Sequence, residues 1–157
     1  MVLEVQPKDS RGYFMLPQAP EGAGYYAYGA PGGGAGQYAH PAMMSMLLFV
    51  ERQWLAMDTR KFGIGNISLA GGGEYAKHRS HKTGLEVDVR PLRKDGKRTP
   101  VYWQWTDQYD QAATAKLIEL FRAYPGAGKI YFNDPELRHL ALPLVHHDHH
   151  FHVELKV

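Results

Sequence analysis

Hydrophobic residues recur at helical spacing in two parts of the chain. The first stripe follows Pro41, which suits the first turn of a helix because its missing N–H is not needed there. It consists of Met43, Met46, Leu47, Val50, Trp54 and Met57. Because this stripe runs the whole length of its element, it predicts a core helix rather than an adaptable methionine surface. The second stripe predicts another helix, capped by Asp107 and ended by Pro125 and Gly126; it consists of Ala113, Leu117, Leu120, Phe121 and Tyr124.

Short alternating segments predict strands between and after these helices. Residues 62–69 alternate and lead into three glycines, and residues 85–90 place Val87 and Val89 on one face and Asp88 on the other. Further strands are expected at residues 101–105, 129–132 and 151–155, with a polar turn at 91–100 and a short helix at 135–140. The order of helix, strands, helix and strands predicts an α+β fold with a small antiparallel sheet and flanking helices.

Length and composition narrow the organisation and the functional classes. A chain of 157 residues suits a single domain, here with a Gly/Tyr-rich lead-in at about residues 1–40 that is expected to form loops and a short strand. A net charge of +2 gives no reason to expect a nucleic-acid partner. No segment approaches the ~18 apolar residues of a transmembrane segment. The N-terminus lacks a signal-peptide pattern, so we expect either a Sec-independent delivery route or prior removal of a signal.

Histidines are the strongest chemical signal. The chain has nine of them and no cysteine, which excludes disulfides, cysteine zinc sites and thiol nucleophiles. On a strand His150 and His152 share a face, and Asp88 lies on the polar face of its own strand. Two imidazoles and one carboxylate with an open fourth position form a catalytic zinc shell, whereas a structural site closes with four protein ligands. The expected zinc site therefore lies on the sheet.

Each piece of this pattern is weak when taken alone. An HxxH motif, here His78 and His81, usually belongs to the surface or to a helix cap, and an HxH motif is usually exposed. Together they favour a metal, because the clustered histidines near the C-terminus would repel one another if charged. A bare surface chelator remains the alternative, and it would need neither Asp88 nor the glycine loop.

The order of the motifs GGG, HxxHxxGxxxD and HxH resembles the penicillin-insensitive murein endopeptidases, within the group that includes lysostaphin, D-Ala-D-Ala peptidases and the hedgehog domain. The resemblance covers roughly residues 25–155, including matching segments at 38–41, 94–97 and 130–135. It implies that one Zn²⁺ ion is bound by His81, Asp88 and His152. It also implies that His150 is the general base or transition-state stabiliser, with His78 and His147 lining the site. Arg98 replaces a histidine after the 95–97 turn, so no second metal is expected there.

The resemblance implies a zinc-dependent endopeptidase that hydrolyses D-Ala–diaminopimelate cross-links between peptidoglycan stem peptides in the periplasm. A second hypothesis makes it a secreted antibacterial effector, with an immunity protein and secretion machinery as partners. The alternatives are a D-Ala-D-Ala carboxypeptidase, a phage-type endolysin, or a non-catalytic metal- or cell-wall-binding module. Five basic residues follow Asp88, and they form either a solvated loop or a contact with substrate carboxylates or the anionic wall; they are Arg90, Arg93, Lys94, Lys97 and Arg98.

Overall fold

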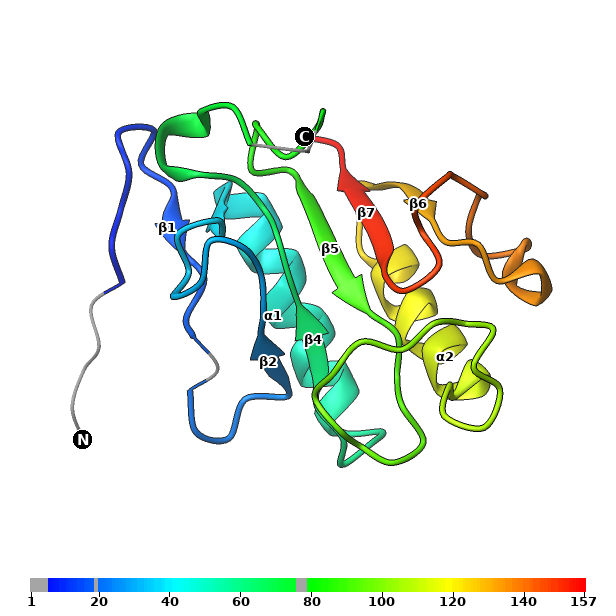
Figure 1. The fold of residues 1–157 in the computed structure, drawn as a ribbon. Coiled ribbons are helices and arrows are strands. Elements are labelled where there is room, and N and C mark those ends of the chain that lie inside the picture. The colour runs from blue at the N-terminus through cyan, green and yellow to red at the C-terminus, as the bar shows by residue number, and fades with distance from the viewer. Residues whose placement is uncertain (1–5, 19, 76–78) are drawn as a thin grey trace.

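The computed structural model describes residues 6–18, 20–75 and 79–157, and it confirms the α+β class (Figure 1). One sheet has the strand order β2-β4-β5-β7-β6. Its strands are β2 (Tyr25–Ala27), β4 (Phe62–Ile64), β5 (Glu86–Arg90), β6 (Ala127–Tyr131) and β7 (Phe151–Leu155). The pairs are antiparallel except β2–β4, which is parallel. Strands β1 (Phe14–Met15) and β3 (Tyr38–Ala39) form a separate antiparallel pair.

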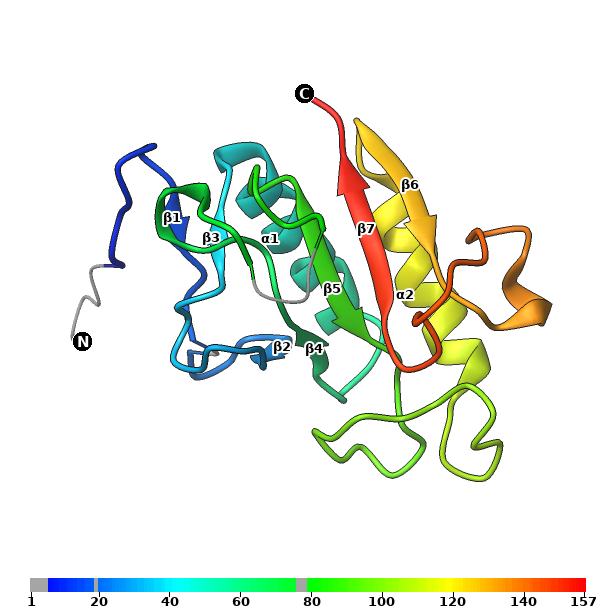
Figure 2. The ribbon, with the colours of Figure 1, turned by 45° about the horizontal axis from the view of Figure 1, so that its top comes forward.

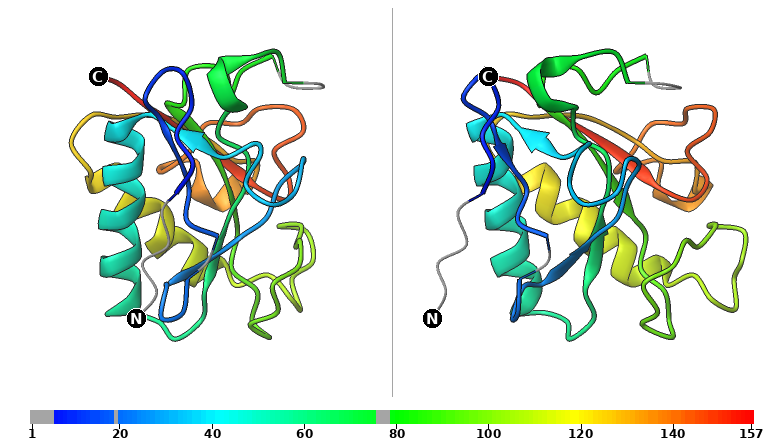
Figure 3. Two further views of the ribbon diagram at one scale, coloured as in Figure 1. Left: turned by 90° about the vertical axis from the view of Figure 1, so that its left-hand side faces the viewer. Right: turned by 60° about the vertical axis from the view of Figure 1, so that its left-hand side comes forward.

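Both α-helices cover the same face of the sheet (Figure 3). Helix α1 spans Pro41–Leu55, as the position of Pro41 predicts, and helix α2 spans Gln111–Ala123. Two short 3₁₀ helices span Ala70–Gly72 and Pro135–Leu137. Within the described residues, no helix combines the length and the apolar character needed to cross a membrane.

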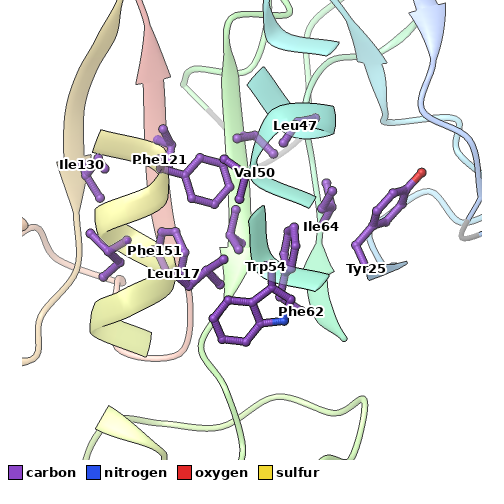
Figure 4. Packing of buried hydrophobic residues seen from close by; sticks show 14 of the residues in the cluster. Tyr25, Leu47, Val50, Trp54, Phe62, Ile64, Leu117, Phe121, Ile130 and Phe151 are labelled. Carbon is purple, nitrogen blue, oxygen red and sulfur yellow. The ribbon is translucent and has the colours of Figure 1, made fainter. Parts of the chain in front are cut away.

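The core lies between the two helices and the sheet (Figure 4). The α1 stripe is buried from Met43 to Trp54, whereas Met57 lies beyond the helix and is half exposed. From the sheet, β5 contributes Val87 and Val89, and β7 contributes Phe151 and Val153, all fully buried. Because side chains alternate along a strand, the polar residues of β5 and β7 must point away from the helices. The helix-free face of the sheet therefore carries the candidate site.

Two local predictions are wrong, and a third holds only in part, because the strand expected at residues 62–69 ends at Ile64. Residues 101–105 form turns rather than a strand, and the Trp103 N–H donates to the Asp148 carbonyl at 3.0 Å. The cap of α2 is Asp110, not Asp107, because the Asp110 carboxylate accepts from the Ala113 N–H at 3.0 Å. Aromatic residues such as Trp103 favour strands in general, but here Tyr102 and Trp103 lie in a loop that contacts the residues just before β7.

Arg60 joins the start of β4 to the start of α2. Its guanidinium contacts Asp58 at 2.6 Å and the capping Asp110 at 2.8 Å, and it donates to the Arg93 carbonyl at 2.9 Å. Hydrogen bonds with Arg60 lower the pKa of Asp58. The pKa of Asp110 is also lowered, since its bonds from the Ala113 N–H and Arg60 outweigh the opposing effect of burial.

We expect Arg60→Met to lower the free energy of unfolding at pH 7 by about 1–2 kcal/mol, since these ion pairs are partly exposed. A carboxylate with a depressed pKa stabilises the fold above its unfolded pKa and loses that contribution as the pH falls through its folded pKa. The cost of Arg60→Met should therefore shrink below about pH 4. Urea unfolding of both proteins at pH 7 and pH 3 measures this, and an equal cost at both values would contradict it.

Candidate metal centre and active site

Strands β5 and β7 lie side by side in the sheet (Figure 2), and their register sets the two central residues of the site opposite each other. Asp88 is the cross-strand partner of His152, and His152 Nδ1 lies 3.0 Å from Asp88 Oδ1. His150 precedes His152 by two residues, and its Nε2 lies 3.8 Å from the same oxygen. Both residues therefore reach one carboxylate from the helix-free face of the sheet.

His81 reaches the same carboxylate from the loop before β5. Its Nε2 lies 3.2 Å from Asp88 Oδ1, while its Nδ1 lies 3.1 Å from the Ile67 carbonyl. The backbone of His81 has a φ of +65°, a conformation that non-glycine residues rarely adopt. Its N–H donates to the Glu86 carboxylate, which fixes this strained turn. Such strain is typical of residues held in place for function.

The donor atoms of His81, Asp88 and His152 fit a metal ion. One ligand atom from each residue lies within 4.8 Å of the other two, and all three residues are buried. Two ligands of a tetrahedral zinc, each about 2.05 Å from the ion, are separated by about 3.3 Å. The nitrogen–oxygen distances of 3.2 Å and 3.0 Å are close to that separation. The Ile67 carbonyl orients the His81 ring, as an outer hydrogen-bond partner does in metal sites.

The charges of the site are strongly coupled. Burial alone would raise the pKa of Asp88, but hydrogen bonds with His152 and His81 hold that pKa far below its usual value. Burial opposes the charged form of His152, yet hydrogen bonds with Asp88 and Glu86 raise its pKa to about 9. The hydrogen bond with His152 also lowers the pKa of Glu86. The carboxylates are therefore ionised at neutral pH, the form in which they bind cations.

A cavity of about 600 Å³ opens over this cluster. His147 lines it, and its ring centroid lies 4.7 Å from that of His150. His147 Nδ1 lies 2.9 Å from the Val145 carbonyl, which fixes the ring orientation. Burial lowers the pKa of His150 to about 4 and also lowers the pKa of His147. Two uncharged imidazoles thus stand beside the candidate metal ligands, in reach of a substrate in the cavity.

The remaining histidines considered in the sequence analysis lie in different parts of the structure. His78 lies outside the described residues, so its place in the site stays a prediction. His149 turns away from the Asp88 cluster and stacks on Tyr102, with ring centroids 5.1 Å apart. His146 is exposed at the cavity, and His40 caps α1 by accepting from the Ala42 N–H at 3.1 Å. The structure therefore brings together five of the six predicted site residues; they are His81, Asp88, His147, His150 and His152.

Glu86 was missed as a site residue. It lies on the same face of β5 as Asp88, contacts His152 Nε2 at 3.8 Å, and holds the His81 backbone. Together with His152 and Glu154 it forms a second group of donors that could hold a metal. The alternation of residues 85–90 already contained the signal, since Glu86 and Asp88 are two residues apart.

The comparison with known families agrees with this geometry. The sequence profile of the penicillin-insensitive murein endopeptidases matches residues 21–119, which include His81 and Asp88 but end before β7. No curated protein matches the chain. The profile covers more than half of the chain, and the part beyond it supplies His147, His150 and His152 from the paired strand β7 and its preceding loop. The chain belongs to the penicillin-insensitive murein endopeptidase family of peptidases.

Proposed function

We propose that the protein is a zinc-dependent murein endopeptidase that hydrolyses D-Ala–diaminopimelate cross-links in the periplasm. The observation that supports this most is the convergence of buried His81, Asp88 and His152 below an open cavity, in a chain of this family. A three-residue donor set leaves a coordination position open, as catalytic zinc sites do. A metal buffer would need no such cavity.

His81, Asp88 and His152 would hold the ion, which as a Lewis acid would polarise the scissile carbonyl and make an attacking water more acidic. His150, whose Nε2 lies 3.8 Å from Asp88 Oδ1, would accept a proton from that water and pass it to the leaving amine. His147, beside His150, gives its Nδ1 proton to the Val145 carbonyl, so its Nε2 would donate to the developing oxyanion only after taking up a proton. The Ile67 and Val145 carbonyls keep the rings of His81 and His147 in fixed orientations.

The test is digestion of purified cross-linked muropeptide dimers, with the products identified by mass. We expect dimers to fall to monomers, chelation to stop the reaction, and added zinc to restore it. Intact dimers that lose only a terminal D-Ala would instead indicate a carboxypeptidase. Sacculi that are bound but never cut would indicate a wall-binding module, and both results would contradict the proposal.

A further inference from the structure

The basic segment after Asp88 contains one arginine, Arg90, whose contacts differ from those of Arg93 and Lys94. Arg93 is only 8% exposed, and its guanidinium donates to both oxygens of Asp95, at 2.8 Å and 2.6 Å, and to the Pro100 carbonyl. Lys94 Nζ donates to the Thr106 carbonyl at 2.9 Å. Arg93 is therefore committed to the loop, and Lys94 is tied to it through one of its three N–H donors. Arg90 is not committed in this way.

Arg90 lies on the candidate site's face of the sheet. It follows Asp88 by two residues on β5, which places it about 7 Å farther along the strand on the same face. Among the described residues, no carboxylate lies within ion-pair distance of its guanidinium. Its hydrogen bond to the Arg98 carbonyl is long, at 3.4 Å. The positive charge of Arg90 is therefore held without an acidic partner.

Two tyrosines and two glycines hold Arg90 in place. The guanidinium carbon lies 3.8 Å from the ring centroid of Tyr28 and 6.0 Å from that of Tyr26. A Cβ at Gly65 would lie 2.5 Å from the Tyr28 ring, and one at Gly63 would lie 2.8 Å from the Tyr26 ring. Gly63 in β4 and Gly65 just after it have no side chains, so the rings of Tyr26 and Tyr28 can lie across them toward β5. Stacking uses the face of the guanidinium, so the N–H groups that do not bond the Tyr26 hydroxyl or the Arg98 carbonyl can donate to a ligand.

A cavity of about 390 Å³ opens beside this arginine. Arg90 and Tyr28 line one side of it, and the turn at Gly32–Gly34 lines the other. Gln37, also in its lining, is buried and donates to the carbonyls of Tyr28, Ile64 and Gly65, at 2.8–3.0 Å. The wall of the cavity is therefore built and fixed. Residues 18–37 supply every lining residue of this pocket except Arg90, which comes from the strand that carries Asp88.

We propose that Arg90, held on the face of Tyr28, is a subsite for a free carboxylate of the substrate next to the scissile bond. The inference rests on the proposed function, because a diaminopimelate cross-link carries a free carboxylate on the carbon that bears the scissile nitrogen. A guanidinium donates to a carboxylate in a bidentate fork, the strongest neutralising contact that a side chain offers. If Arg90 paired with an acidic side chain of the protein, that carboxylate would occupy the fork of N–H groups. Stacking on the face of Tyr28 does not occupy it.

The experiment compares two cross-linked dimers, one with the free diaminopimelate carboxylate and one with that carboxylate amidated. Calorimetry with the full chain, kept metal-free so that the dimers stay intact, gives the dissociation constants, and steady-state digestion with zinc gives KM and kcat. We expect Arg90→Gln to weaken binding of the free-carboxylate dimer and raise its KM by about 10- to 100-fold. Its affinity for the amidated dimer should match that of the unmodified chain, and Arg90→Lys should recover part of the loss.

Two further variants separate the subsite from general effects. Arg52→Gln, on the exposed side of α1 behind the sheet, makes the same charge change and should leave both dissociation constants unaltered. Tyr28→Leu removes the aromatic face but keeps Arg90, so it should weaken binding of the free-carboxylate dimer alone, and Tyr28→Phe should recover most of it. This pair also serves if Arg90→Gln fails to fold.

The outcomes distinguish this inference from the proposed function. Equal binding of the free-carboxylate dimer by Arg90→Gln and the unmodified chain would overturn the subsite, even if the dimers are cleaved. Equal losses for both dimers would overturn it too, because the arginine would then act on the fold or on the whole surface. If the unmodified chain neither binds nor cleaves either dimer, the proposed function fails and the subsite fails with it.

Discussion

Asp88→Ala is expected to abolish hydrolysis of cross-linked dimers, lowering kcat/KM by on the order of 10⁴-fold or more. Asp88 Oδ1 is the atom to which His81, His150 and His152 all point, at 3.2 Å, 3.8 Å and 3.0 Å. Its loss removes one of the three candidate metal donors and leaves the buried imidazoles without their counter-charge. Metal binding should therefore fail together with activity, rather than activity alone.

The measurement is a calorimetric titration of zinc into the metal-free chain, made beside the dimer digestion. His152→Ala should behave like Asp88→Ala, because it removes the partner across the β5–β7 pair. His139→Ala makes the same histidine change at an exposed position outside the cavity, and it should keep both zinc binding and activity. Circular dichroism verifies that each variant is folded. Full hydrolysis by a folded Asp88→Ala protein would refute the metal assignment.

The elements whose pattern of hydrophobic and polar residues repeats along their whole length were predictable from the sequence. The stripe after Pro41 gave helix α1 with its buried face, and the alternation at residues 151–155 gave strand β7. Alternation also separated the apolar face of β5 from the face of Asp88. It could not reveal the register that sets Asp88 opposite His152, since register depends on which strands pair and where each begins.

Residues placed by loops and by close packing escaped prediction. His81 sits at a φ of +65°, a position that no periodic pattern encodes, so only the weak HxxH motif and the family resemblance indicated it. The alternation of Phe62, Gly63, Ile64 and Gly65 was visible, but its role as a floor for Tyr26 and Tyr28 depends on the parallel pairing of β2 with β4. Long-range pairing of this kind brings distant segments together, so a local pattern cannot show it.

His150→Ala is expected to lower kcat by about 10²- to 10⁴-fold while zinc binding persists, the range typical of removing a general acid–base group. The reason is position: His150 lies on the same face as His152, its Nε2 is 3.8 Å from Asp88 Oδ1, and it lines the cavity. It is outside the three-donor group of His81, Asp88 and His152. Its loss should therefore affect the reaction of bound substrate more than metal or dimer affinity.

The matched control for His150 is its neighbour. His149→Ala removes an adjacent imidazole that stacks on Tyr102 instead of facing Asp88, so its effect on kcat should be much smaller. Single-turnover digestion, with zinc affinity measured in parallel, separates the two residues. A His150→Ala protein that loses zinc as fully as Asp88→Ala would make His150 a ligand, and one with unchanged kcat would transfer the proton-transfer role to another group. His147, with its ring centroid 4.7 Å from that of His150, would then be the residue to test.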